Sequence, residues 1–165
     1  MNTTISFKNR ELAGIANTLG KFKLKGKASL GRSALIRKLA SKQEEYVSDR
    51  VLIQQKYFES DKDGNLKTQD DGSEKLIPKS ELSDKKDPSK LAKDSESNLN
   101  SEMGELSDDF ANIDFSEYSA RFKALKLSLD DYPYELEKED AIVYERVYDQ
   151  LEQAFSKGEK SYELN

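Results

Sequence analysis

The sequence contains no cysteine and no histidine among its 165 residues. Without cysteine, disulfide bonds and thiolate chemistry are excluded. Without histidine, the chain lacks the commonest metal ligand and the side chain that most often acts as a general base near neutral pH. A catalytic site would have to be built from Asp, Glu, Lys, Ser or Tyr alone, and no convincing motif of that kind is present. The sequence therefore predicts no catalytic residue, no metal site and no cofactor, and a protein that is not an enzyme.

Long apolar runs are also missing, since no stretch approaches the roughly 18 residues that a membrane-spanning helix needs. Residues 1–10 lack the apolar segment of a secretory signal, so we expect a cytoplasmic protein without membrane contact. Hydrophobic residues make up only 35% of the chain and charged residues 36%, against about 25% charged in a typical domain. Elongated helices, a disordered segment, or burial against a partner would each fit this composition.

The longest regular pattern is an apolar stripe at helical period over residues 33–58, which no Pro or Gly interrupts. Ser33 can cap its start, and the turn-forming residues 60–64 can end it. Such a helix would be roughly 39 Å long, too long to bury its stripe without several partner segments. The prediction is a mainly α single domain over residues 1–165, an antiparallel helical assembly around one long central helix. Its predicted core residues are Leu35, Leu39, Tyr46, Ile53, Tyr57, Phe122, Leu125, Val147 and Leu151.

Shorter elements surround this helix. The alternating residues 3–7 and residues 112–115 predict two short strands that pair with each other, a minor β element. Apolar periodicity predicts further helices over residues 10–19, from Ser116 until Pro133 ends it, and over residues 138–156. Gly158 is expected to end the last helix and leave a frayed tail over residues 159–165.

Residues 60–100 are polar and predict an insertion of hairpin and loop that is flexible in part. A small exposed hairpin is expected around the turn at residues 70–73. Residues 79–98 fit either a loop or a solvated helix that begins at Asp87-Pro88. Acidic groups at Glu59, Asp61 and Asp63 imitate an EF-hand loop, but Lys67 stands at its ninth position and a hairpin follows. The sequence therefore predicts an acidic turn rather than a calcium site.

Charge is unevenly distributed along the chain. Residues 1–58 hold 12 Lys/Arg and 4 Asp/Glu, whereas residues 59–165 hold 15 and 28. Glycines and basic residues precede the central helix, an arrangement that suits phosphate although the spacing is not that of a P-loop. The basic half either docks on the acidic helices or binds an external anion or partner. The candidate residues for anion or partner binding are Lys21, Lys23, Lys25, Lys27, Arg32, Arg37 and Lys38.

Five segments of the chain resemble a family of small proteins of unknown function from tailed phages and prophages of Gram-positive bacteria. They are residues 7–12 (FKNREL), residues 24–29 (LKGKAS), the long helix, residues 61–65 (DKDGN), and residues 114–118 (DFSEY) followed by Leu125. The resemblance implies phage origin, a helical fold and no assigned activity. It transfers no catalytic residues.

These observations favour a non-enzymatic phage component that binds a protein. It would be either a virion-associated protein, of the tail or structural, or a protein that binds a host protein. The partner would be a phage or host protein, with a homo-oligomer as a further alternative. The second hypothesis is a nucleic-acid-binding protein that uses the basic face of residues 21–38. The expected location is the cytoplasm of the host cell, with incorporation into the virion as an alternative.

Overall fold

The structure is a computed structural model that describes residues 2–163, with side chains described for residues 2–156. Its contacts divide the chain into two compact units. The core unit comprises Met1–Gln43 and Phe110–Asn165, and the inserted unit comprises Glu44–Asp109. The polar insertion expected at residues 60–100 lies within the inserted unit, whose bounds are wider.

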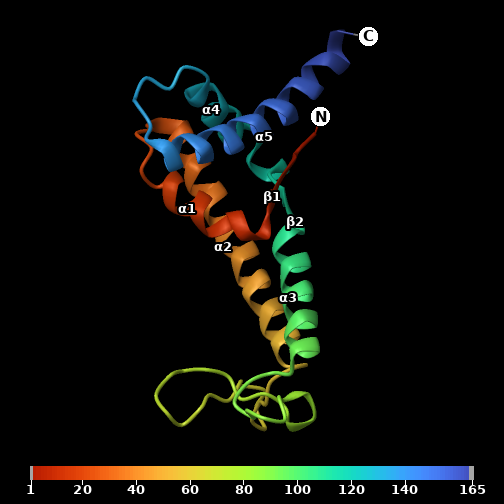
Figure 1. Ribbon diagram of the computed structural model, residues 1–165. Helices are drawn as coiled ribbons and strands as arrows, with labels where there is room; N and C mark the ends of the chain where they lie inside the picture. Colours follow the sequence, from red (N-terminus) through yellow and green to blue (C-terminus); the bar gives the residue numbers. More distant parts are fainter. Residues whose placement is uncertain (1, 164–165) are drawn as a thin grey trace. The chain divides into compact units, whose positions relative to one another are not determined.

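Helices dominate the described residues, as the sequence predicted (Figure 1). The elements are β1 (Thr4–Lys8), α1 (Leu12–Leu19), α2 (Gly26–Gln54), α3 (Lys93–Asp108), β2 (Phe110–Asp114), α4 (Ser119–Asp130) and α5 (Lys138–Glu163). Short 3-10 turns at Asn9–Glu11 and Ser116–Tyr118 lead into α1 and α4. The predicted fold class, a helical assembly with one long central helix and a minor β element, is confirmed.

The two predicted strands pair with each other. They run antiparallel, with Ile5 opposite Ile113 and Phe7 opposite Ala111. All four of these side chains are buried, whereas the alternate residues of both strands are not, because successive side chains of a strand point to opposite faces. One face of the sheet therefore belongs to the hydrophobic core.

Helix α5 packs against α4, α1 and β1 within the core unit. Six predicted core residues have no exposed surface, and all lie in this unit: Leu35, Leu39, Phe122, Leu125, Val147 and Leu151. The rings of Phe115 and Phe122 stack at 4.7 Å between centroids. The other three predicted core residues lie in the inserted unit, where Tyr57 is buried but Tyr46 and Ile53 remain half-exposed.

The predicted start of the central helix is wrong, because α2 begins at Gly26 rather than at Ser33. Gly26 has a positive φ of 60°, which glycine adopts without strain. Gly31 lies inside the helix, where an added Cβ would overlap the carbonyl oxygen of Arg121 on α4. Glycine at position 31 therefore allows α2 and α4 to pack closely.

The end of the last helix also differs from the prediction. Helix α5 runs through Gly158 as far as Glu163, since one glycine inside a helix costs only about 1 kcal/mol relative to alanine. The tail expected over residues 159–165 is thus helical in its first part, and residues 164–165 lie outside the described residues.

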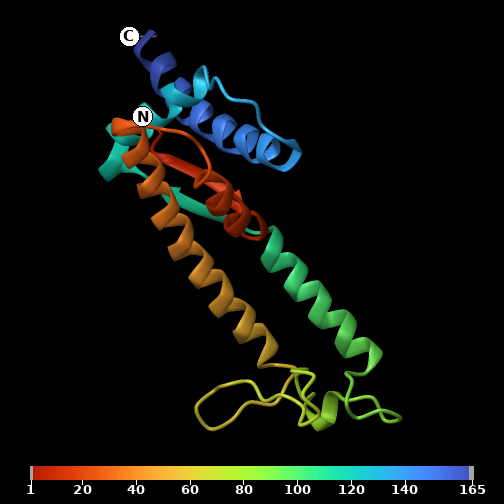
Figure 2. The same ribbon diagram turned by 90° about the vertical axis from the view of Figure 1, so that its left-hand side faces the viewer.

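Between α2 and α3, the inserted unit folds into short paired segments without continuous strands (Figure 2). Isolated bridges join Thr68 to Leu76 and Phe58 to Pro78, which supports the expected hairpin. Residues 79–98 were expected to form either a loop or a helix that begins at Asp87-Pro88. Neither alternative is fully correct, because a helix, α3, is present but begins at Lys93. Asp87 instead accepts hydrogen bonds from the backbone N–H and the hydroxyl of Ser89, so Asp87-Pro88 forms a turn.

Candidate interaction surfaces

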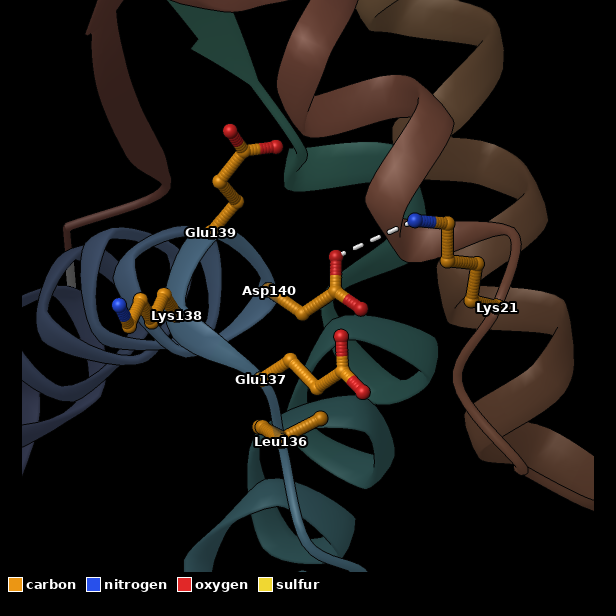
Figure 3. A pocket seen from close by; sticks show the side chains of 6 residues that line it. All are labelled: Lys21, Leu136, Glu137, Lys138, Glu139 and Asp140. Carbon is orange, nitrogen blue, oxygen red and sulfur yellow. Dashed lines mark hydrogen bonds and ion pairs between the residues drawn. The ribbon is translucent and has the colours of Figure 1, made fainter.

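All seven predicted binding residues lie in the core unit, and three of them are held by the protein itself. Lys21 Nζ lies 3.3 Å from Asp140 Oδ1, at the first turn of α5 (Figure 3). Arg32 donates to the backbone carbonyl of Phe22. Lys38 Nζ lies 5.5 Å from the ring centroid of Tyr118, a favourable cation–π distance.

The other four, Lys23, Lys25, Lys27 and Arg37, are exposed. Among residues 2–156, none of these four forms an ion pair with a carboxylate. Of the seven predicted binding residues, therefore, only Lys21 forms the ion pair that docking of the basic segment on the acidic helices would require.

Two of these cations line a groove that we call the lysine–tyrosine groove. Its volume is about 460 Å³, and its lining residues are Lys23, Leu24, Lys25, Ser128, Tyr132, Pro133 and Tyr134. The connection between α1 and α2 contributes the lysines, the end of α4 contributes Ser128, and the loop that follows α4 contributes the tyrosines. Segments more than 100 residues apart in the sequence thus form one surface.

Aromatic packing fixes the shape of this groove. Phe22 is buried, and its ring centroid lies 5.2 Å from that of Tyr132. The backbone N–H of Lys23 donates to the Tyr132 hydroxyl at 3.0 Å, and the ring of Tyr134 lies 5.4 Å from the ring of Tyr132. The side chain of Lys23 is also placed, because its Nζ lies 4.7 Å from the centroid of the Tyr134 ring.

A second cavity of the core unit, of about 590 Å³, lies beside Lys21 and residues 136–140. Figure 3 shows Asp140 turned toward Lys21, while the carboxylate of Glu139 points elsewhere. No group of acidic residues in the described part of the chain is arranged to hold a metal ion.

The loop that imitates an EF-hand lies in the inserted unit. Its Asp61 accepts hydrogen bonds from the backbone N–H groups of Asp63 and Asn65, so the Asp61 carboxylate shapes an acidic turn.

Ionisable groups elsewhere in the core unit tie its elements together. Arg146 on α5 donates two hydrogen bonds to Glu11, at 2.9 and 3.2 Å. Burial raises the pKa of Glu11, but the bonds from Arg146 and from the backbone of Lys8 outweigh burial and lower it.

A second ionic network joins α4 to α5. Lys126 Nζ lies 3.2 Å from Asp130 and 3.0 Å from Glu152. The hydroxyl of Tyr148 donates to Asp130 at 2.9 Å, and this bond, with burial and the charge of Asp130, raises the pKa of Tyr148 to about 12. Because each group is engaged by its neighbours, the network serves the packing of the two helices.

The inserted unit presents a different kind of surface. Within it, Tyr57 and Pro78 alone among the described residues are buried, and α3 has no buried residue. A cavity of about 590 Å³ is lined by polar and charged residues together with five apolar ones, of which Pro78 is buried and the other four are half-exposed. The apolar residues that line this cavity are Phe58, Leu76, Pro78, Leu91 and Leu99.

The charge asymmetry of the sequence follows the division into units. The inserted unit, residues 44–109, contains 10 Lys/Arg and 18 Asp/Glu, so its net charge is -8. The core unit contains 17 and 14, so its net charge is +3.

Sequence reasoning did not select Tyr132 and Tyr134, because neither falls on a helical stripe. The signal that could have found them is Tyr-Pro-Tyr at residues 132–134, directly after an apolar helix.

The fold and these surfaces define a mainly helical protein with an inserted, poorly buried acidic unit. None of the described helices is long and apolar enough to cross a membrane. Residues 1–159 match the model of the family described as protein of unknown function (DUF1617), and the chain belongs to this family. Searches of curated proteins and of solved structures give no match.

Proposed function

We propose that this chain is a non-enzymatic protein-interaction component that binds a protein partner through its inserted unit. The observation that carries the proposal is the nearly complete lack of buried apolar residues among the 66 residues of that unit. Ordered helices and paired segments normally derive their stability from a buried apolar face. In the inserted unit, such a face would be completed by a partner.

The apolar residues available for this contact surround the cavity of the inserted unit. Phe58 follows the end of α2, Leu91 precedes α3, and Leu99 lies on α3. Each is only half-buried, so a partner would remove the rest of its surface from water, at about 25 cal/mol per Å² of apolar area. Exposed apolar patches bordered by polar residues are typical of protein interfaces.

The resemblance of the sequence to small phage and prophage proteins suggests where this role is performed. We propose a component of a tailed phage that is made in the host cytoplasm. It would act either within the virion, as a tail or structural protein, or on a host protein. Self-association is included, because the partner could be a second copy of the chain.

The proposal can be tested by affinity capture from infected cells, with the full chain as bait and mass spectrometry of what is retained. Leu99→Glu should abolish capture of the partner, because it places a charge among the apolar residues that line the cavity. Leu127→Glu is the matched control, since Leu127 lies on α4 of the core unit and is 55% exposed. Retention that survives Leu99→Glu but is lost with Leu127→Glu would overturn the proposal.

A second candidate function is nucleic-acid binding through residues 21–38. The observation that favours it is the lack of a carboxylate partner for Lys23, Lys25, Lys27 and Arg37 among residues 2–156. Phosphate binding falls steeply with salt concentration. Retention on heparin or DNA at about 0.2 M salt would support this function, and loss at about 0.05 M would contradict it.

A further inference from the structure

We propose that the lysine–tyrosine groove binds a short acidic peptide segment of a protein partner, with its carboxylates on Lys23 and Lys25. This site lies in the core unit and is independent of the contact proposed for the inserted unit. The two proposals can therefore fail separately.

The charge of the groove supports an anionic ligand. Among the described residues that line the groove, Lys23 and Lys25 are the charged ones, and none of these residues is a carboxylate. Lysine donates three hydrogen bonds and accepts none. A carboxylate that enters the groove would meet two ammonium groups together with the hydroxyl group of Ser128.

The remaining lining favours a peptide that also carries an apolar side chain. Leu24, Pro133 and the rings of Tyr132 and Tyr134 form the apolar part of the groove. Tyr134 is 48% exposed, and tyrosine is common at interfaces because it combines a large apolar area with a polar tip. A segment with an apolar residue between two acidic residues matches this pattern.

The groove needs little rearrangement before it binds. Phe22 and Tyr132 are packed together, and Tyr132 also accepts the backbone hydrogen bond from Lys23. Tyr134 holds the side chain of Lys23 by a cation–π contact. Groups that are ordered before binding lose less conformational entropy when the ligand arrives.

The sequence around the groove argues against a nucleic acid. Six acidic residues lie within eleven positions that include Tyr132 and Tyr134: Asp130, Asp131, Glu135, Glu137, Glu139 and Asp140. An extended polyanion would be repelled by these charges. A short acidic segment needs only Lys23 and Lys25, and basic residues on both sides of it would be attracted by the acidic residues of 130–140.

The test uses the full chain and a fluorescent peptide, Lys-Gly-Glu-Leu-Glu-Gly-Lys, at low salt. Fluorescence anisotropy should show binding, and replacing both Glu residues of the peptide with Gln should weaken it at least tenfold. In the protein, the double change Lys23→Gln and Lys25→Gln should weaken binding of the acidic peptide by a similar factor. The control pair, Lys85→Gln and Lys86→Gln, makes the same charge change in the inserted unit and should leave binding intact.

Unchanged melting temperatures would show that the variants fold, as expected because Lys23 and Lys25 are both exposed. Equal binding of the Glu and Gln peptides, equal loss with both variant pairs, or no binding at millimolar peptide would overturn the proposal. A single-stranded oligonucleotide of 20 thymidines that binds more tightly than the peptide would reassign the groove to nucleic acid.

Discussion

Gly31 of α2 lies directly against the backbone of Arg121 of α4. A Cβ atom built on Gly31 would stand 2.9 Å from the carbonyl carbon of Arg121 and 3.2 Å from the Cβ of Leu125. Backbone cannot yield as a flexible side chain can, so the spacing of these two helices depends on the absence of a side chain at position 31.

Gly31→Ala should therefore destabilise the protein even though alanine is the better helix former. Overpacking of a tight core contact costs about 1–3 kcal/mol, which exceeds the roughly 1 kcal/mol of helix propensity that alanine gains. Urea unfolding followed by circular dichroism would measure the change. Gly14→Ala is the control, because nothing lies within 4 Å of its added Cβ, and it should be neutral or slightly stabilising.

Leu39→Ala tests the core contribution of α2. Leu39 has no exposed surface, and truncation of a buried leucine to alanine costs about 2–5 kcal/mol. Leu30 lies on the same helix but is 50% exposed, so Leu30→Ala should cost clearly less. Equal shifts of the urea midpoint for the two variants would contradict the burial of Leu39.

The pair Glu11–Arg146 predicts a pH dependence of stability. The pKa of Glu11 is lower in the folded protein than its ordinary value of 4.5, so the folded state binds the proton less readily than the unfolded state. The pair therefore stabilises the protein fully above pH 4.5, and this stabilisation is lost as the pH falls through the folded-state pKa.

Glu11→Gln should lower the free energy of unfolding at pH 7, by on the order of 1 kcal/mol for a partly exposed charged hydrogen bond. At pH 3 the difference between wild type and variant should shrink. Urea titrations at the two pH values would measure it, and a difference that grows on acidification would refute the assignment.

Calcium should not bind the loop at residues 59–70. The Asp61 carboxylate is occupied by two backbone N–H groups, and these bonds hold its pKa below the ordinary value. Millimolar calcium should leave the thermal midpoint unchanged. An upward shift in wild type that disappears in Asp61→Ala would instead establish a calcium site.

The sequence alone predicted the helices and strands whose formation depends on local residue patterns. Local patterns predicted both strands, the start of a helix directly after each strand suggested that they pair, and the apolar stripe of residues 119–130 was sufficient to place Phe122 and Leu125 in the core. The start of α2 was predicted wrongly because the sequence alone does not distinguish Gly26, where the helix begins, from Gly31, which lies inside it. The contact with Arg121, which the sequence does not reveal, is what identifies Gly31 as a glycine of helix packing rather than of a turn.

The lysine–tyrosine groove could be predicted only in part. Lys23 and Lys25 were selected for their charge, but Tyr132 and Tyr134 come from a connection more than 100 residues away. Burial of Phe22 beside Tyr132 brings the two segments together. The poor burial in the inserted unit could be expected from its polar composition. The N-terminal boundary of this unit could not be predicted, because it falls inside the continuous helix α2.

The pairing of β1 with β2 has a consequence for the order in which the chain folds. Thr4 pairs with Asp114 and Lys8 with Phe110, so the first strand has no partner until more than 100 further residues have been synthesised. Closing so long a loop carries an entropic cost that local helix formation does not. The sheet and the core that it covers therefore cannot be completed before β2 and α5 have been synthesised.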